Sequence, residues 1–586
     1  MSISKLTPSS VDSAKPKINW ARIDEADNFA NTVKLYRQGK YDEDSFRRFR
    51  LQHGAYGTRM TSDYAMVRVK LPAGEIYPKQ FETLSRLSEQ YSIGSAHFST
   101  RENIQLHWVI LEDVSEIFRS LAEVGLTSRE ACGNSVRNVM CSPLSGVCSD
   151  EKFDSTPYAL ATAKFFLRNP MAQSLPRKFK FNFTCCEKHG MVRMVDVGLI
   201  PEIQQINGSK QKGFKIFLGG GLGNRSFVGH QLEDFTPEED LLYTSIAVMR
   251  IFDRLGDRKN LARNRMRYLV NDMGWEKFQN LVLKERAIVR ATQSVVTKLK
   301  VDTTPDKITR PLKISDEGGS SVPDGYARWL KSNTIKQKQS DYRSVFITLE
   351  AGDITSNQLN SMAALIREFS SEGKARSGFV QNVALRYVHE DDLVKLYSRL
   401  LETGLAKSGG LTMTAPVGCS GTTSCNLALT NSHRLAKEIQ RKFLELKLDE
   451  DDDLADSSIK ISGCPNSCAQ HGIATIGFFG GGGRFDADTT LGQTCLRVPA
   501  KRVIPVILKI IELFKANKQS DDTLKSWIHR IVNDSEDSDI KSIGDIKKVL
   551  EPLVAPPTKE DDPDFYLDYG SDTSYHTKTG KGECAA

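Results

Sequence analysis

The chain has 586 residues, of which 39% are hydrophobic and 26% are charged. This composition is typical of a folded globular protein, and the length exceeds what one hydrophobic core usually supports, so we expect three or four domains. The net charge of +7 is spread along the chain. It suits an acidic partner or a polyanionic cofactor and argues against nucleic-acid binding.

The apolar stretches and the cysteines of the sequence indicate in which cellular compartment the protein resides. The most apolar stretch, 503–514, is interrupted by Lys509 and is too short to span a membrane. The first 17 residues lack the apolar core of a secretory signal, and Asp12 argues against an organelle transit peptide. Eleven cysteines at uneven spacing indicate a reducing compartment with some thiols as ligands. We therefore expect a cytoplasmic protein without membrane contact.

The first part of the chain alternates between strand and helix patterns. Residues 1–60 form a polar arm that ends in a basic, aromatic stretch. Residues 65–71 predict a strand, 79–91 an amphipathic helix, 96–110 a hairpin and 115–124 a second helix that ends at Gly125.

A duplication follows from a phrase that returns later in the chain. The segment 67–76, Val-Arg-Val-Lys-Leu-Pro-Ala-Gly-Glu-Ile, is similar to 345–354, Val-Phe-Ile-Thr-Leu-Glu-Ala-Gly-Asp-Ile, 278 residues later. Further on, aligning His189 with His471 sets Cys186 opposite Cys468. Two copies predict a pseudo-twofold domain rather than a solenoid, within an α/β (α+β) fold.

Four cysteines in two close pairs indicate a shared metal site. The pairs are Cys419-Ser-Gly-Thr-Thr-Ser-Cys425 and Cys464-Pro-Asn-Ser-Cys468. The first spacing fits a zinc knuckle poorly, whereas an iron–sulfur cluster accepts four thiolates, and nearby glycines let backbone N–H groups face sulfur. On spacing alone, a zinc site or a set of buried thiols remains an alternative.

This cysteine pattern resembles the siroheme and 4Fe–4S signature of the sulfite and nitrite reductase hemoprotein family, especially assimilatory sulfite reductase hemoproteins (the β-component). The resemblance covers about residues 45–550. It implies that Cys419, Cys425, Cys464 and Cys468 hold the cluster and that Cys468 also bridges to the siroheme iron. It further implies a three-domain core, divided as 1–60 (an arm wrapping the core), 61–129 with 340–408 (a pair of ferredoxin-like repeats), 130–294 (siroheme and substrate), 295–339 (a linker), 409–550 (cluster and siroheme) and 551–586 (a tail).

The same resemblance implies an anion-binding quartet made of Arg68, Arg137, Lys178 and Lys180. In a strand, side chains two residues apart point to the same side, so both lysines can reach one anion. Arginines hold oxyanions through forked donors, and lysines can also supply protons. Plant-type nitrite reductases, which resemble this family, usually carry asparagine in place of the second lysine. Lys180 therefore favours sulfite, although the segment 463–471 is closer to ferredoxin-dependent members.

Siroheme carries carboxylates that need cationic and N–H partners. The glycine runs at 219–221 and 480–483 do not form a dinucleotide-binding loop, so we expect no nucleotide site and a separate electron donor, either a ferredoxin or a flavoprotein subunit. The candidate siroheme contacts are His53, Tyr56, Arg101, Asn103, Gln105, His107, Gly219, Gly220, Gly221, Arg258, Lys259, Asn260, Arg263 and Arg267.

The resemblance implies the six-electron reduction of sulfite to sulfide in sulfur assimilation. A ferredoxin-dependent nitrite reductase that makes ammonium with the same cofactors is the alternative, and a non-catalytic electron-transfer protein is a third possibility. Some ferredoxin-dependent relatives join a tyrosine and a cysteine covalently beside the cofactor, which makes Tyr56 and Cys132 candidates. Cys584 lies in the tail and is interpreted as an incidental free thiol.

Overall fold

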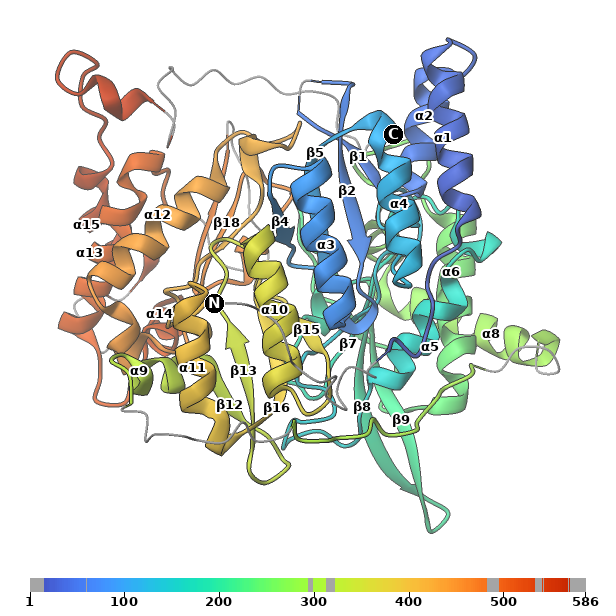
Figure 1. Cartoon of the computed structure of the whole chain (residues 1–586). Helices are drawn as coiled ribbons and strands as arrows, with labels where there is room; N and C mark the ends of the chain where they lie inside the picture. The colour runs from blue at the N-terminus through green and yellow to red at the C-terminus, as the bar shows by residue number, and fades with distance from the viewer. Residues whose placement is uncertain are drawn as a thin grey trace.

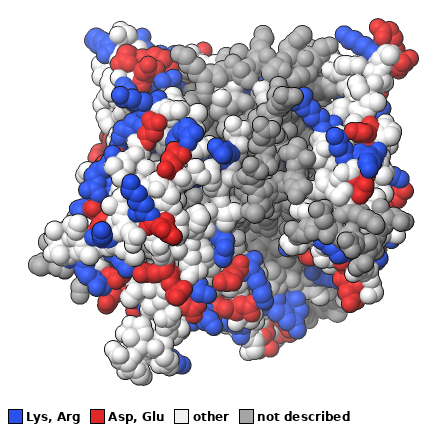
Figure 2. All heavy atoms as spheres, turned by 180° about the vertical axis from the view of Figure 1, so that it is seen from behind, with Lys and Arg blue, Asp and Glu red and all other residues white. Residues whose placement is uncertain are grey.

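The protein is an α/β structure built from two related halves (Figure 1). The computed structural model describes residues 15–59, 61–293, 299–311, 322–481, 495–532, 540, 542–567 and 569. None of the helices within these ranges has the length and apolar character needed to cross a membrane. On the back of the molecule, positive and negative side chains alternate over the described surface (Figure 2).

Each half contributes one five-stranded sheet covered by two helices. The first sheet has the order β1 (Ala55–Gly57), β2 (Tyr64–Lys70), β5 (Asn103–Ile110), β4 (Ser95–Phe98) and β14 (Asp353–Thr355), with helices α3 (Pro78–Tyr91) and α4 (Val114–Glu123). The second has the order β12 (Thr334–Lys336), β13 (Tyr342–Ile347), β16 (Val383–His389), β15 (Ala375–Ser377) and β3 (Glu75–Ile76), with α10 (Ser356–Phe369) and α11 (Leu393–Glu402). These bounds confirm the predicted strand, helix, hairpin and helix of residues 65–124.

The two sheets exchange a strand, and the duplicated phrase is the segment that crosses. Ala73 and Ala351 have φ of 54° and 49°, and the glycine after each has φ of 72° and 88°. A Cβ on Gly74 would lie 2.7 Å from the Ser377 carbonyl oxygen, and one on Gly352 would lie 2.4 Å from that of Phe98. These tight turns require glycine and deliver β3 to the second sheet and β14 to the first.

The exchange brings helices α3 and α10 side by side across the pseudo-twofold axis (Figure 1). Ser85 donates to the Ser356 carbonyl oxygen at 2.7 Å, and Ser356 donates to Glu89 at 2.6 Å. One hydrophobic core runs through both repeats, with Phe81 and Ile366 fully buried in it.

A third and a fourth sheet extend the two halves. The third sheet has the order β10 (His230–Gln231), β9 (Ser209–Leu218), β8 (Val197–Ile206), β7 (Phe181–Phe183) and β6 (Met140–Cys141), with β11 (Thr236–Pro237) also on β9 and with helices α5 (Thr156–Phe166), α6 (Leu241–Leu255), α7 (Met266–Met273) and α8 (Trp275–Gln293). The fourth has the order β17 (Val417–Gly418), β18 (Ile459–Ser462) and β19 (Ile476–Phe479), with α12 (Ser432–Glu445), α13 (Val503–Asn517), α14 (Leu524–Val532) and α15 (Ile543–Leu550).

Strands β6, β7 and β8 correspond to β17, β18 and β19, and both sets run parallel. A Cβ on Gly198 would lie 1.9 Å from the Val192 carbonyl oxygen, and one on Gly477 would lie 2.2 Å from that of His471. In the structure, therefore, the residue at the position equivalent to His471 is Val192 rather than His189. The alignment drawn from sequence was wrong by three residues at this point, because it matched the two His-Gly pairs instead of the strands.

Two segments differ from their sequence-based description. The arm contains helices α1 (Asp24–Arg37) and α2 (Glu43–Gln52), and Phe29 of α1 packs edge-on against Phe118 of α4 with ring centroids 5.0 Å apart. The expected linker contains helix α9 (Tyr326–Asn333) and strand β12, and Trp329 is fully buried against Tyr397. A single buried tryptophan in a polar segment leaves little periodic signal.

His53 of the arm predicts acid sensitivity. Burial, and then the charge of Arg129, lowers the pKa of His53 from 6.5 to about 4. Between these values the unfolded chain binds a proton that the folded chain does not, so the free energy of unfolding decreases as pH falls, by up to about 3 kcal/mol, and is independent of His53 above pH 6.5. Urea unfolding of His53→Gln should therefore show a flatter pH dependence than wild type from pH 6.5 to 4. The exposed His529→Gln is the control, and equal slopes in all three proteins would contradict the prediction.

Candidate active site

The four thiols of the cysteine pattern gather beside the fourth sheet. Cys419 follows β17, Cys425 ends the next turn, and Cys464 and Cys468 lie in the loop after β18. Burial, and then the proximity of Cys468, raises the pKa of Cys425 and of Cys464 to about 12. The same two causes raise the pKa of Cys419. These three thiols resist ionisation and need positive metal charge to become thiolates.

The spacing and surroundings of this quartet fit a multi-iron cluster. Among the described residues, the groups whose ligand atoms all lie within 4.8 Å do not include these four cysteines, so the quartet is wider than a single-ion site. The Gly463 N–H donates to Cys419 Sγ at 3.1 Å, and Ser432 Oγ lies 3.1 Å from the same sulfur. Cys468 is exposed, which leaves one ligand of the quartet open to a neighbouring group.

Hydrogen bonds tie the cysteine loop to the first repeat. Thr100 Oγ1 donates to the Cys468 carbonyl oxygen at 2.9 Å, and the Gln470 amide donates to the Thr100 carbonyl oxygen at 3.3 Å. Lys460 Nζ donates to the Gln470 side chain at 2.8 Å. The residue after Thr100 is Arg101, so these bonds place Cys468 next to a cationic turn.

Cations gather around Asp196, which is fully buried. The Lys180 N–H donates to its carboxylate at 3.0 Å, and Arg265 donates to it at 2.9 Å. Burial, and then the charges of Arg101 and Arg265, lowers the pKa of Lys180 well below its usual value. Burial, and then Arg137, lowers the pKa of Arg101. Several cations that share one carboxylate in poorly solvated surroundings favour the binding of anions.

Lys178 and Lys180 lie on the same side of an extended segment that leads into β7. Phe179 between them is fully buried, whereas both lysines are half-buried. Phe179 bridges to Val136, and the Arg137 N–H donates to the Phe179 carbonyl oxygen at 2.9 Å. The alternation expected from sequence is present, although the regular strand begins only at residue 181.

Arg68 and Arg137 meet at one backbone carbonyl. Arg137 donates to the Ala131 carbonyl oxygen at 3.0 Å, and Arg68 donates to the same oxygen at 3.5 Å. Arg68 also lies over the ring of Tyr56, 5.6 Å from its centroid. The structure thus brings both arginines of the predicted anion-binding set to the beginning of β7, where the two lysines of that set lie.

Gln105 links Arg68 to His107. Gln105 stands opposite Arg68 in the sheet, accepts from the guanidinium at 3.3 Å and donates to His107 Nε2 at 3.2 Å in the amide orientation that satisfies both neighbours. The buried His107 Nδ1 and Asn103 Oδ1 have no hydrogen-bond partner within the described residues. Unpaired buried polar atoms next to a cationic recess are consistent with a bound polar group.

The first glycine run lies against two arginines. A Cβ on Gly221 would lie 3.1 Å from Arg267 Cδ, and one on Gly220 would lie 2.1 Å from the Arg193 carbonyl oxygen. Within the described structure, the buried Arg267 Nη1 lacks a hydrogen-bond partner. Arg265, the residue that caps the beginning of α7, was missed from sequence, and its signal was the alternation with Arg263 and with Arg267 in the first turn of that helix. Gly219 also belongs to this loop and has φ of 80°.

Other predicted contacts lie elsewhere. His53 is buried in the arm, where it accepts from Arg129 at 2.7 Å. Cys132 Sγ lies 3.8 Å from the Gly54 carbonyl oxygen, two residues before Tyr56. Gly482, Gly483 and Cys584 lie outside the described residues. The exposed residues of the basic segment are Arg258, Lys259, Asn260 and Arg263. Arg258 pairs with Asp253, and Arg263 pairs with Asp272.

The chain matches two family models. The nitrite and sulphite reductase 4Fe-4S domain matches residues 132–289, and the nitrite/sulfite reductase ferredoxin-like half domain matches residues 57–124 and 335–403. The second model covers the two repeats found from sequence and confirms the duplicated fold. The first covers the lysine-bearing half rather than the half with Cys419 and Cys468.

Curated relatives span most of the chain. The assimilatory ferredoxin-dependent nitrite reductase of Haloferax mediterranei is 28% identical, covering 79% of this chain and 82% of the relative. The sulfite reductase (ferredoxin) 1 of Mycolicibacterium paratuberculosis is 27% identical, covering 72% and 71%. The structure of the NirA protein of Mycobacterium tuberculosis superposes with a TM-score of 0.68 at 23% identity, covering 87% of this chain and 94% of that one, and so has the same fold.

Replacing Cys468 should remove the metal-binding capacity of the quartet. Because the other three thiols lie close beside it, Cys468→Ser should leave the protein with less than about a tenth of the wild-type acid-labile sulfide. Cys495→Ser is the control, since that half-buried thiol lies only 3.9 Å from the Ile543 carbonyl oxygen and outside the quartet. Full sulfide content in purified Cys468→Ser would contradict this assignment.

Proposed function

The chain belongs to the nitrite and sulfite reductase family, and from that premise we propose that it reduces sulfite to sulfide, a six-electron reaction. The cofactors of the family are siroheme and a 4Fe–4S cluster. When bound, they supply an iron on which the anion is reduced and a store of electrons delivered one at a time. Cys419, Cys425, Cys464 and Cys468 would hold the cluster, and Cys468, the exposed ligand, would also face the siroheme iron.

The observation that carries the choice of sulfite is Lys180 beside Lys178 in the group of cations around Asp196. At neutral pH sulfite carries more negative charge than nitrite, and a recess with several cations and one carboxylate favours the more highly charged anion. Arg68 and Arg137 would orient the oxyanion through forked donors. Burial, and then the charges of Arg101 and Arg265, lowers the pKa of Lys180, so its ammonium group would give up a proton more readily than an ordinary lysine as the oxygens leave as water.

The other cationic groups would hold the siroheme carboxylates. Arg101 lies next to the Cys468 loop, and Arg265 and Arg267 lie against Gly221. The unpaired Arg267 Nη1 supports this role. We also propose that the electrons come from a ferredoxin, because relatives that act on sulfite and on nitrite are both named as ferredoxin-dependent.

Nitrite reduction to ammonium is the second candidate. Two relatives, from Haloferax mediterranei and from rice, are named as nitrite reductases, at 28% and 26% identity. Measuring kcat/KM for both anions with reduced ferredoxin decides between the two. We expect the larger value for sulfite, and a clear preference for nitrite would overturn the argument from Lys180.

The Lys180→Asn variant tests the lysine directly. Loss of this half-buried cation should lower kcat/KM for sulfite by about 10- to 100-fold and lower that for nitrite less, so the ratio shifts toward nitrite. Lys210→Asn, on the exposed part of the β8–β9 hairpin, is the control and should keep the wild-type ratio. An unchanged ratio in Lys180→Asn, with siroheme absorption retained, would show that Lys180 does not select the substrate.

A further inference from the structure

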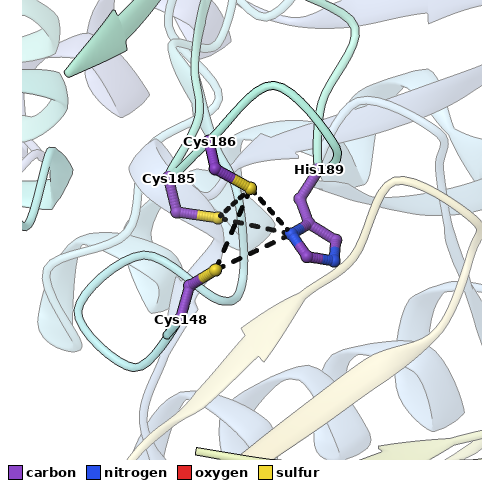
Figure 3. Close-up of side chains that lie close together, drawn as sticks. All are labelled: Cys148, Cys185, Cys186 and His189. Carbon is purple, nitrogen blue, oxygen red and sulfur yellow. Dashed lines mark hydrogen bonds between the residues drawn. The ribbon is translucent and has the colours of Figure 1, made fainter. Parts of the chain in front are cut away.

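A second group of metal-binding side chains lies in the first half, outside the active site. Cys148 comes from the loop after β6, and Cys185, Cys186 and His189 come from the loop after β7. The four side chains point toward one another (Figure 3). All three thiols are buried, and the four ligand atoms lie within 4.8 Å of one another.

The distances match a single tetrahedral ion. Cys186 Sγ lies 3.9 Å from Cys148 Sγ and 4.0 Å from Cys185 Sγ. His189 Nδ1 lies 3.1 Å from Cys186 Sγ and 3.8 Å from each of the other two sulfurs. Tetrahedral zinc with ordinary bond lengths separates two sulfurs by about 3.8 Å and a sulfur from a nitrogen by about 3.6 Å. A four-iron cluster would hold its cysteines farther apart, and a disulfide much closer.

This group occupies the place that the cysteine quartet has in the other half. The Ser142 N–H donates to the Phe183 carbonyl oxygen as the Cys419 N–H donates to that of Ile461, which pairs Ser142 with Cys419. The same register pairs three more ligand positions. These are Cys148 with Cys425, Cys186 with Cys464, and His189, three residues before Val192, with Cys468, three residues before His471.

The loops around the group are held in place from the second repeat. Arg386 donates to the Pro143 carbonyl oxygen at 3.2 Å, and Gln339 donates to that of Gly146 at 2.9 Å. Phe346 of β13 and Ala384 of β16 pack with the three cysteines. Ser142 Oγ lies 3.5 Å from Cys185 Sγ, where its hydroxyl can donate to a thiolate. The ligands are therefore positioned before any metal binds.

We propose that Cys148, Cys185, Cys186 and His189 bind one zinc ion in a closed structural site. Four protein ligands complete the coordination of a tetrahedral zinc ion and leave no position for substrate, as is typical of structural zinc sites. Three thiolates and a neutral imidazole favour zinc over hard cations such as magnesium. The ion would clamp the loops after β6 and β7, and these strands carry Arg137 and Lys180 at their opposite ends. The site stabilises the fold and takes no electrons, because zinc has no accessible redox change.

The test is the metal content of the purified holoenzyme. Elemental analysis should find about one zinc per chain in wild type and in the control Cys141→Ser, and close to none in Cys186→Ser and His189→Ala. Cys141 is a suitable control because it is buried in β6 and bonds to Ser155 rather than to the group. Siroheme absorption and acid-labile sulfide should be the same in all soluble variants, which separates this site from the cysteine quartet.

Zinc K-edge absorption on wild type tests the geometry even if a variant fails to fold. It should show three sulfurs at about 2.3 Å and one nitrogen at about 2.0 Å. The proposal would be overturned if wild-type protein lacked zinc or if both Cys186→Ser and His189→Ala retained it. A disulfide among these cysteines, or iron in place of zinc, would overturn it as well.

Discussion

Among the described residues, several cations crowd around one buried carboxylate, that of Asp196. Lys180, Arg101 and Arg265 converge near Asp196, and they come from three separate parts of the chain. Crowding like charges in a poorly solvated space costs free energy unless anions compensate them. The fold therefore depends on anionic groups to complete its interior, and binding of cofactor and substrate contributes to its stability.

The duplicated core shows how one scaffold can support two kinds of metal chemistry. The loops after β6 and β7 and those after β17 and β18 share a strand register, yet their side chains diverge. On one side four thiols are spread widely enough for several irons, whereas on the other three thiols and an imidazole meet closely enough for one ion. At equivalent positions the first half has Ser142 for Cys419, Cys185 for Gly463 and His189 for Cys468. Under the two proposals above, these three differences separate a structural metal site from one for electron transfer.

Much of this organisation could be predicted from sequence, and the omissions have physical causes. The repeats were found because the segment 67–76 returns in similar form as 345–354, and the cysteine pairs were found because their spacing is local. The exchange of β3 and β14 could not be predicted, since Ala-Gly turns do not indicate which sheet receives the next strand. Arg265 was missed because its importance comes from Asp196, which is distant in sequence. The group around His189 was hidden by an alignment that followed identical letters rather than backbone register.

The exchanged strands also determine when the protein can finish folding during synthesis. The sheet that begins at β1 is completed by β14, so its β4 edge remains open until the ribosome has passed Thr355. Until then, a nascent chain presents unpaired backbone donors and acceptors next to an apolar core. The first half thus cannot mature as an independent unit, because the second half supplies the last strand of its sheet.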